Sequence, residues 1–186
     1  MANHSNRRDL MVETAADLFI ANGYRATSVR QIADAVGCTE AALYYHFPGG
    51  KRTLLQAVIE TYAPDFLRGI APCAAADSLP ALLACFSDNL QANPQNQQRL
   101  RWIIAEFANL SAAEQALVRQ KIVAFHAEMT EMLRPFTPDS DPAHLAWLLI
   151  AATQGHLVLF NYLGLDTAVD HTLATQNQLI AQLLIR

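Results

Sequence analysis

The sequence has few cysteines, and their spacing argues against two kinds of cross-link. Only Cys38, Cys73 and Cys85 are present among 186 residues, and no two of them form a Cys-x-x-Cys pair. An odd number of cysteines without that spacing favours neither a disulfide framework nor a zinc knuckle. We therefore expect reduced thiols, most of them buried.

Long apolar runs are also missing. No stretch reaches the roughly 18–20 uninterrupted apolar residues of a membrane helix, and the start MANHSNRRDL lacks the apolar core of a signal peptide. These absences predict a cytoplasmic protein without a membrane partner. Because 52% of the residues are hydrophobic and 16% are charged, we expect a folded globular chain rather than a disordered one.

The common motifs of enzymes are absent as well. The chain contains no G-x-S-x-G, no P-loop and no H-E-x-x-H. Its histidines are scattered at positions 4, 46, 126, 144, 156 and 171, without the helical pairing that favours zinc. The sequence therefore predicts a protein that is not an enzyme and that has neither a metal site nor a cofactor.

Charge is unevenly distributed along the chain, whose net charge is −4. Residues 1–52 contain six basic and five acidic side chains, whereas residues 53–186 contain seven basic and twelve acidic ones. A mildly basic head thus precedes an acidic body. Because the local field governs binding more than the total charge does, nucleic acid stays open as a partner.

The head is predicted to form three short helices. Apolar residues recur at helical spacing over residues 8–21. A second helix follows Ser28, which is in capping-box register with Gln31, and Thr39 caps a third helix over residues 40–46. Two short helices joined by a turn that contains glycine form a helix-turn-helix, although similar pairs also serve as packing units.

The rest of the chain is also predicted to be helical, because prolines and glycines divide it into segments without alternating strand patterns. The predicted helices cover residues 51–63, 65–71, 78–93, 96–109, 112–134, 141–163 and 168–185. The predicted fold is therefore all-α. It consists of a helix-turn-helix head over residues 1–52 and a helical body over residues 53–186.

The third helix carries polar side chains that a core does not need, which favours DNA binding over a packing role. Lys51 and Arg52 begin the next helix, where the helix dipole disfavours cations. A phosphate held at this point would account for both residues. In the alternative interpretation, the preceding Gly49-Gly50 is only a flexible turn.

The head resembles a known family. The run ETAADLFIANGYRATSVRQIADAVGCTEAALYYHFPGGKRTLLQAV resembles the DNA-binding head of TetR-family transcriptional regulators, and its HFPGGK segment resembles a subgroup with one extra residue before the lysine. Beyond residue 60 only the helical architecture is similar. The resemblance implies a repressor that binds a palindromic operator in double-stranded DNA as a homodimer and is released by a small-molecule effector.

The resemblance also implies roles for individual residues. Thr27 and Ser28 hold phosphate, and Arg30 reaches a base or a phosphate from the second helix. Tyr44, His46 and Lys51 hold the DNA backbone, whereas Glu40, Ala41 and Tyr45 face base edges. Family members often have a basic or neutral residue at position 40 and glycine at position 41. Glu40 and Ala41 depart from this pattern, and the departures affect which operator sequence is expected, not the class of protein. The DNA-binding residues implied in this way are Thr27, Ser28, Arg30, Thr39, Glu40, Ala41, Tyr44, Tyr45, His46 and Lys51.

The last two predicted helices are the candidates for a dimer interface. A single short recognition helix reads few base pairs, so regulators of this type bind two-fold sites as dimers, and similar family members dimerise through their last two long helices. Residues 143–163 contain no charged side chain other than histidine. Monomer core is the alternative. The predicted interface residues are Ala151, Ala152, Gly155, Leu159, Leu179 and Leu183.

Aromatic and methionine residues recur in the middle helices. Such residues usually form core, but the resemblance implies an effector pocket in the body, and the aromatic content favours a mostly apolar small molecule. The predicted lining residues are Trp102, Phe107, His126 and Met129. A second hypothesis, favoured by Glu40 and the weak charge of the head, is a helical protein-interaction module whose head has lost specific DNA binding.

Overall fold

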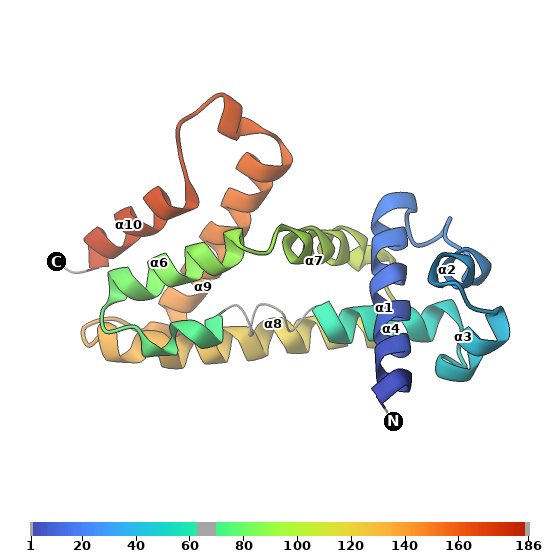
Figure 1. The fold of residues 1–186 in the computed structure, drawn as a ribbon. Helices are drawn as coiled ribbons and strands as arrows, with labels where there is room; N and C mark the ends of the chain where they lie inside the picture. The colour runs from blue at the N-terminus through green and yellow to red at the C-terminus, as the bar shows by residue number, and fades with distance from the viewer. Residues whose placement is uncertain (1, 63–69, 185–186) are drawn as a thin grey trace. The chain divides into compact units, whose positions relative to one another are not determined.

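The computed structural model describes residues 2–62 and 70–184, and all regular structure in these two ranges is helical (Figure 1). The α-helices are α1 (Ala2–Asn22), α2 (Val29–Val36), α3 (Glu40–His46), α4 (Lys51–Tyr62), α6 (Leu79–Gln91), α7 (Pro94–Glu106), α8 (Ala112–Leu133), α9 (Pro142–His156) and α10 (Leu173–Leu184). Shorter helical turns are η1 (Ala71–Ala75), η2 (Phe107–Asn109), η3 (Arg134–Phe136), η4 (Leu157–Tyr162) and η5 (Leu165–Thr167). The predicted all-α class is confirmed.

Local signals in the sequence set the ends of the short helices in the head. The Ser28 side chain accepts a hydrogen bond from the Gln31 backbone N–H at 3.1 Å, and the Ser28 N–H donates to Gln31 Oε1 at 2.7 Å. This is the predicted capping box of α2. Gly37 ends α2 in the left-handed conformation at φ 73°, and Thr39 caps α3. Residues 28–46 thus determine the helix-turn-helix locally.

The later helices differ from the predicted boundaries at two places. The helix expected over residues 141–163 begins with Asp141 as N-cap and Pro142 in its first turn, but it changes to a π-helical turn after His156. The last helix begins at Leu173 rather than at residue 168. The short turn η5 and a non-helical segment occupy the residues between Leu165 and the start of α10. Most of the helix expected over residues 65–71 lies outside the described residues.

The chain divides into two compact units, and neither is continuous in sequence. One unit comprises Met1–Asp65 and Gln95–Gln120, and the other comprises Phe66–Pro94 and Lys121–Arg186. This grouping differs from the expected division after residue 52, because α4 spans that position and packs against α1. The division into a head of residues 1–52 and a body of residues 53–186 therefore stays a prediction about function.

In the first unit, α1 packs against α2 and α4, and α2 packs against α3 (Figure 1). The core of the head includes large side chains with at most 1% exposure, among them Met11, Phe19, Ile32, Leu43, Phe47 and Leu54. The Trp102 ring of α7 stacks on Phe19 with 5.6 Å between ring centroids. The second stretch of this unit, Gln95–Gln120, thus contributes a side chain to the core of the head.

The second unit has its own apolar core, formed by η1, α6, α8, α9 and α10. Its most buried side chains include Leu82, Leu83, Met129, Leu133 and Leu149. Within it, α10 packs against α6, and Asn177 Nδ2 donates to Ser87 Oγ at 2.7 Å. The pairing satisfies two polar groups that the packing of α10 on α6 buries.

Two of the three cysteines correct the expectation of reduced thiols. Cys73 and Cys85 form a disulfide, with 5.7 Å between their Cα atoms, whereas Cys38 is free and partly buried. The chain turns back between η1 and α6, and this return brings together residues separated by 12 positions. Sequence spacing alone does not reveal such a return.

One segment of the described chain, Pro142–Phe160, is long and apolar enough to cross a membrane by length and composition. Polar side chains interrupt this segment, so it is not one of the uninterrupted apolar runs that the sequence lacks. Leu145 and Leu149 pack in the core of the second unit, and Thr153 and His156 are buried polar residues. A core helix of a water-soluble protein passes the same test, so we assign no membrane span.

Candidate nucleic-acid interface

Helix α3 is held by its apolar side chains and presents the others to solvent. Leu43 and Phe47 are 0% and 1% exposed, whereas Tyr44 and Tyr45 are 46% and 76% exposed. Thr39, Glu40 and Ala41 are also exposed. An anchored helix with an open polar and aromatic face is the geometry that lets a recognition helix enter the major groove.

The start of α2 adds two exposed donors. The side chain of Arg30 is 79% exposed, and its contact with Asp34 at 3.8 Å is a weak surface ion pair. The Ser28 hydroxyl oxygen accepts the capping hydrogen bond, so its own O–H stays available to donate. Both residues therefore have the freedom that a phosphate contact requires.

Thr27 differs from this pattern. Its side chain is 1% exposed, and its hydroxyl lies within hydrogen-bonding distance of the carbonyl oxygens of Leu18 and Gly23, at 3.2 and 2.9 Å. The hydroxyl therefore stabilises the turn between α1 and α2. The geometry gives no support to the expected phosphate contact of this side chain.

Lys51 has a role that the sequence did not reveal. Its Nζ donates to the carbonyl oxygens of Tyr24 at 2.8 Å, Arg25 at 3.3 Å and Thr27 at 2.7 Å, and it lies 4.5 Å from the centroid of the Tyr24 ring. Burial lowers the pKa of Lys51. Carbonyl oxygens thus account for the cation at this helix start, so no phosphate is needed to explain it.

The turn before α4 brings Gly50 against Tyr44. Gly50 has φ 61°, and a Cβ atom at this position would lie 3.0 Å from Tyr44 Cε1. The Tyr44 ring is thereby supported from one side, while His46 lies partly buried with its ring 5.3 Å from that of Tyr45. Gly50 is therefore part of a packed turn that requires glycine, whereas the alternative interpretation expected only a flexible turn.

Arg99 is an important residue of this unit that sequence reasoning missed. Its guanidinium lies 3.0 Å from Asp17 Oδ1 and 3.5 Å from Glu13 Oε1, and 4.2 Å from the centroid of the Tyr62 ring. Arg99 is only 5% exposed. Because the two carboxylates belong to α1 and Arg99 to α7, the contact joins parts of the sequence more than 80 residues apart, which no local pattern could indicate.

The four predicted effector residues are divided between the two units. Trp102 lines a cavity in the first unit, whereas the Phe107 ring lies 5.1 Å beneath the Arg119 guanidinium. In the second unit, His126 stacks on Trp147 at 4.3 Å, and Met129 is a core residue with 1% exposure. Trp102 therefore has the surroundings of a lining residue, and the role of the other three stays a prediction.

The predicted dimer residues lie on α9, η4 and α10, and most of them are exposed. Leu159, Leu179 and Leu183 are 45%, 51% and 70% exposed. Gly155 is exposed, and a Cβ atom there would meet nothing within 4 Å. Ala151 is exposed and Ala152 is half-buried. Side chains of this kind in solvent are typical of a surface that another protein covers.

Comparison with known proteins agrees with this geometry. Residues 11–58 match the family described as bacterial regulatory proteins, tetR family. The transcriptional regulator LmrA of Bacillus subtilis (strain 168) is 33% identical over 79 residues, which is 42% of each chain. The transcriptional repressor KstR2 of Rhodococcus jostii (strain RHA1) is 39% identical over 61 residues, which is 33% of this chain and 29% of KstR2. The chain thus spans less than half of the length of these relatives.

Solved structures extend the similarity of fold to almost the whole chain. A putative transcriptional regulator from Pseudomonas aeruginosa PAO1 has a TM-score of 0.78 at 18% identity, covering 98% of this chain and 90% of that one. A putative TetR-family regulator from Rhodococcus sp. has a TM-score of 0.74 at 17% identity, covering 98% and 100%. Residues 11–58 thus resemble the helix-turn-helix head of the tetR family of bacterial regulatory proteins, and over the rest of the chain the similarity to solved structures is one of fold.

Proposed function

We propose that this protein is a DNA-binding transcriptional regulator that reads the major groove with α3. The observation that carries the proposal is the open face of this helix, on which Tyr45 is 76% exposed while Leu43 and Phe47 anchor the opposite face. The family match over residues 11–58 supports it. Ser28 and Arg30 contact phosphates from α2, and Glu40, Ala41 and Tyr45 lie against base edges.

The regulator acts as a dimer on a palindromic operator. One helix as short as α3 spans only a few base pairs, so two copies related by two-fold symmetry give the specificity that a regulator needs. The exposed apolar surface of α9, η4 and α10 is the proposed interface. It includes Leu148 at 54% exposure and Leu159 at 45%. In a two-fold dimer the same surface of each copy packs against that of the other, so these apolar side chains become buried.

The regulator is a cytoplasmic repressor that a small effector releases from DNA. KstR2 of Rhodococcus jostii (strain RHA1), which shares the head, is a transcriptional repressor. A ligand that binds the DNA-incompetent arrangement more tightly shifts the equilibrium away from the operator.

Selection of duplexes from a random pool by the purified chain, at near-physiological salt, tests the proposal. We expect an inverted repeat to be enriched. Tyr45→Ala should enrich a different sequence, whereas Glu128→Ala, an exposed change on α8, should enrich the original one. A folded protein that enriches no sequence would contradict the proposal and favour the protein-interaction module.

A further inference from the structure

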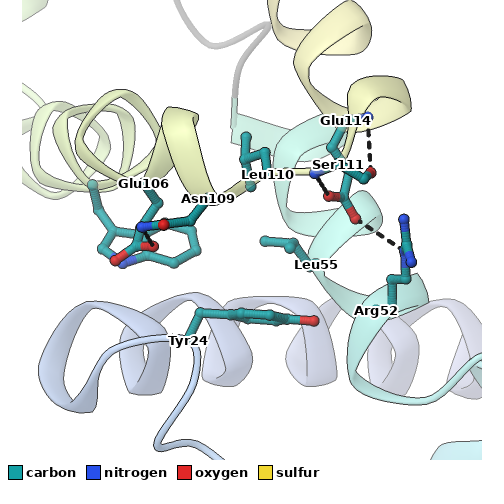
Figure 2. Close-up of a pocket in the computed structure, with 9 residues that line it drawn as sticks. Tyr24, Arg52, Leu55, Glu106, Asn109, Leu110, Ser111 and Glu114 are labelled. Atoms are coloured by element: carbon teal, nitrogen blue, oxygen red, sulfur yellow. Dashed lines mark hydrogen bonds and ion pairs between the residues drawn. The ribbon is translucent and has the colours of Figure 1, made fainter.

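The first unit contains a cavity of about 250 Å³ that the DNA-binding role does not use. Its walls come from the turn after α1, from α4 and from the segment that joins α7 to α8 (Figure 2). The apolar part consists of Leu55, Trp102, Leu110 and the ring of Tyr24. Because drug-sized ligands occupy cavities of roughly 300–1,000 Å³, this one suits a single ring with a short substituent.

A buried carboxylate forms the polar wall of the cavity. Glu114 is 4% exposed, and its Oε2 accepts the backbone N–H of Ser111 at 2.7 Å in the capping box of α8. Among the described residues, its Oε1 has no hydrogen-bond donor and pairs with the Arg52 Nε at 3.5 Å. The side chain of Arg52 is 64% exposed, so solvent screens this pair and Arg52 can leave it.

The remaining polar groups make the cavity negative. Glu106 lines it together with Asn109, whose Nδ2 donates to Glu106 Oε2 at 3.0 Å. Two carboxylates and one guanidinium thus line the cavity. Burial and the Glu114 carboxylate raise the pKa of Tyr24, the phenol in the same wall. An anionic ligand would meet a net repulsive field here, whereas a cation would meet an attractive one.

A second buried group also lacks a partner. The indole Nε1 of Trp102 has no hydrogen-bond acceptor in the described part of the chain. One face of its ring is covered, since it stacks on Phe19. The cavity is thus lined by one residue whose donor has no acceptor and by a carboxylate oxygen held only by the exposed Arg52, and a ligand can satisfy both groups.

We propose that this cavity binds a small planar organic cation, with its N–H groups on Glu114 Oε1 and its ring against Tyr24, Leu55 and Trp102. The cation takes the place of the Arg52 guanidinium at the carboxylate. Aromatic walls favour a flat cation because the ring faces carry negative potential. The proposal deepens the effector role above, and its regulatory consequence rests on the proposed function.

Binding here would reach the DNA-binding surface through two residues. Arg52 begins α4 next to Lys51, and Lys51 holds the carbonyl oxygens of the 24–27 turn that leads into α2. Tyr24 contributes its ring to the cavity and its carbonyl oxygen to Lys51. A cation that releases Arg52 from Glu114 therefore changes the contacts of the segment that places Ser28 and Arg30.

Fluorescence titration without DNA tests the site, so the result is independent of the proposed function. Trp102 and Trp147 are the only tryptophans in the sequence, and Trp147→Phe leaves Trp102 as the reporter. Benzamidine is the probe, and benzoate is its matched anion of similar shape. We expect saturable binding of benzamidine, at least about tenfold tighter than benzoate, because a hydrogen bond to a charged group contributes roughly 1.5–3 kcal/mol.

Variants of the ion pair should change the affinity in opposite directions. Glu114→Gln keeps the capping-box hydrogen bond but should weaken benzamidine about tenfold, whereas Arg52→Gln should tighten it by removing the competing cation. Glu128→Gln, an exposed change, is the control. Where Glu114→Gln does not fold, Glu106→Gln serves with the same expected direction. Equal affinity for benzoate, no saturation with benzamidine, or unchanged affinity in the folded carboxylate variant would overturn the proposal.

Discussion

Lys51 and Arg30 are both basic residues of the head, but their surroundings differ. Lys51 places three donors on carbonyl oxygens of residues 24–27, whereas Arg30 has only the weak exposed contact with Asp34. Removing the Lys51 side chain takes away the ammonium that donates to partly buried carbonyl oxygens. Removing the Arg30 side chain takes away only an exposed contact with Asp34. A residue that positions the proposed DNA-binding surface can thus be separated from one that is proposed to contact DNA.

Alanine substitutions should make this separation visible. Lys51→Ala should lower the free energy of unfolding by about 1–3 kcal/mol, since unsatisfied polar groups cost that much. Arg30→Ala should change it by less than about 1 kcal/mol while reducing the log–log salt slope of DNA binding by roughly one unit. Urea denaturation and binding at several salt concentrations measure the two effects. Equal loss of stability in both variants would contradict these different roles.

His156 is a buried titratable residue of the second unit. It is 6% exposed, and its Nδ1 has no hydrogen-bond partner in residues 2–62 and 70–184. Its ring stacks on Phe160 at 4.6 Å, with the His171 ring 5.7 Å away. Burial, and after it the charge of His171, lower the pKa of His156 below 6.5. The folded chain therefore resists protonation of a group that the unfolded chain protonates freely.

The stability of the chain should fall on acidification because of His156. Between its folded pKa and about 6.5, the unfolded chain binds a proton that the folded chain does not, so the free energy of unfolding decreases as the pH falls through this window. Above about 6.5 the contribution of His156 is constant. His156→Phe should flatten the profile, measured as urea midpoints against pH, whereas His144→Asn, an exposed change, should not. An unchanged profile in His156→Phe would assign the effect to other groups.

At the scale of elements, the disulfide joins η1 to α6. Cys73 and Cys85 close a loop of 12 positions, and Cys73 is part of the apolar core of the second unit. Closing a loop of this size lowers the conformational entropy of the unfolded chain, which stabilises the fold by about 3 kcal/mol. The bond therefore fixes the start of the second unit on its core.

Reduction should accordingly destabilise the second unit. Dithiothreitol should lower the urea midpoint of the wild type and of Cys38→Ala, and a Cys73→Ala/Cys85→Ala double variant should have the lower midpoint with or without reductant. The expected difference in unfolding free energy is about 2–4 kcal/mol. A thiol count that shows full reduction of the wild type without any shift of the midpoint would contradict a stabilising role for the bond.

The exposed surface of α9 can be tested at Gly155. Since a Cβ atom there meets nothing within 4 Å of its own chain, Gly155→Ala should stabilise the protomer, by about 1 kcal/mol. Gly155→Asp should place a charge in the proposed interface and give monomers with weakened operator binding. Ala127→Asp, at an exposed position of α8 outside the proposed interface, is the control. A stable dimer of Gly155→Asp in sedimentation would exclude this surface as the interface.

Most of the helices were predictable because their signals are local. Ser28 with Gln31, Gly37 and Thr39 set the ends of α2 and α3 through neighbours a few residues away. The disulfide and the Arg99 contacts with α1 depend on the path of the chain between distant residues, which local patterns do not contain. Of the predicted DNA-binding residues, Tyr45 and Arg30 are exposed as expected, while the surroundings of Thr27 and Lys51 required the structure.

At the scale of the whole molecule, the first unit is built from two separate stretches of sequence. The head alone, residues 1–62, contains α1 to α4, but Arg99 and Trp102 come from the second stretch and contact Asp17 and Phe19 on α1. A cut after residue 52 would also remove most of α4, whose Leu54 is fully buried. The unit that folds is therefore larger than the unit that reads DNA.

Fragments of the chain should differ in stability according to how much of the first unit they contain. Residues 1–52 should not fold, because Leu54, Leu55 and Val58 leave the core. Residues 1–62 should fold with α1 amides exchanging faster than in the full chain, since Phe19 loses a stacked partner that contributes roughly 0.5–1.5 kcal/mol and Asp17 loses Arg99. Trp102→Ala in the full chain should accelerate the same amides, whereas Trp147→Phe should leave them unchanged. Equal hydrogen exchange of α1 in the 1–62 fragment and the full chain would show that the head folds independently of residues 95–120.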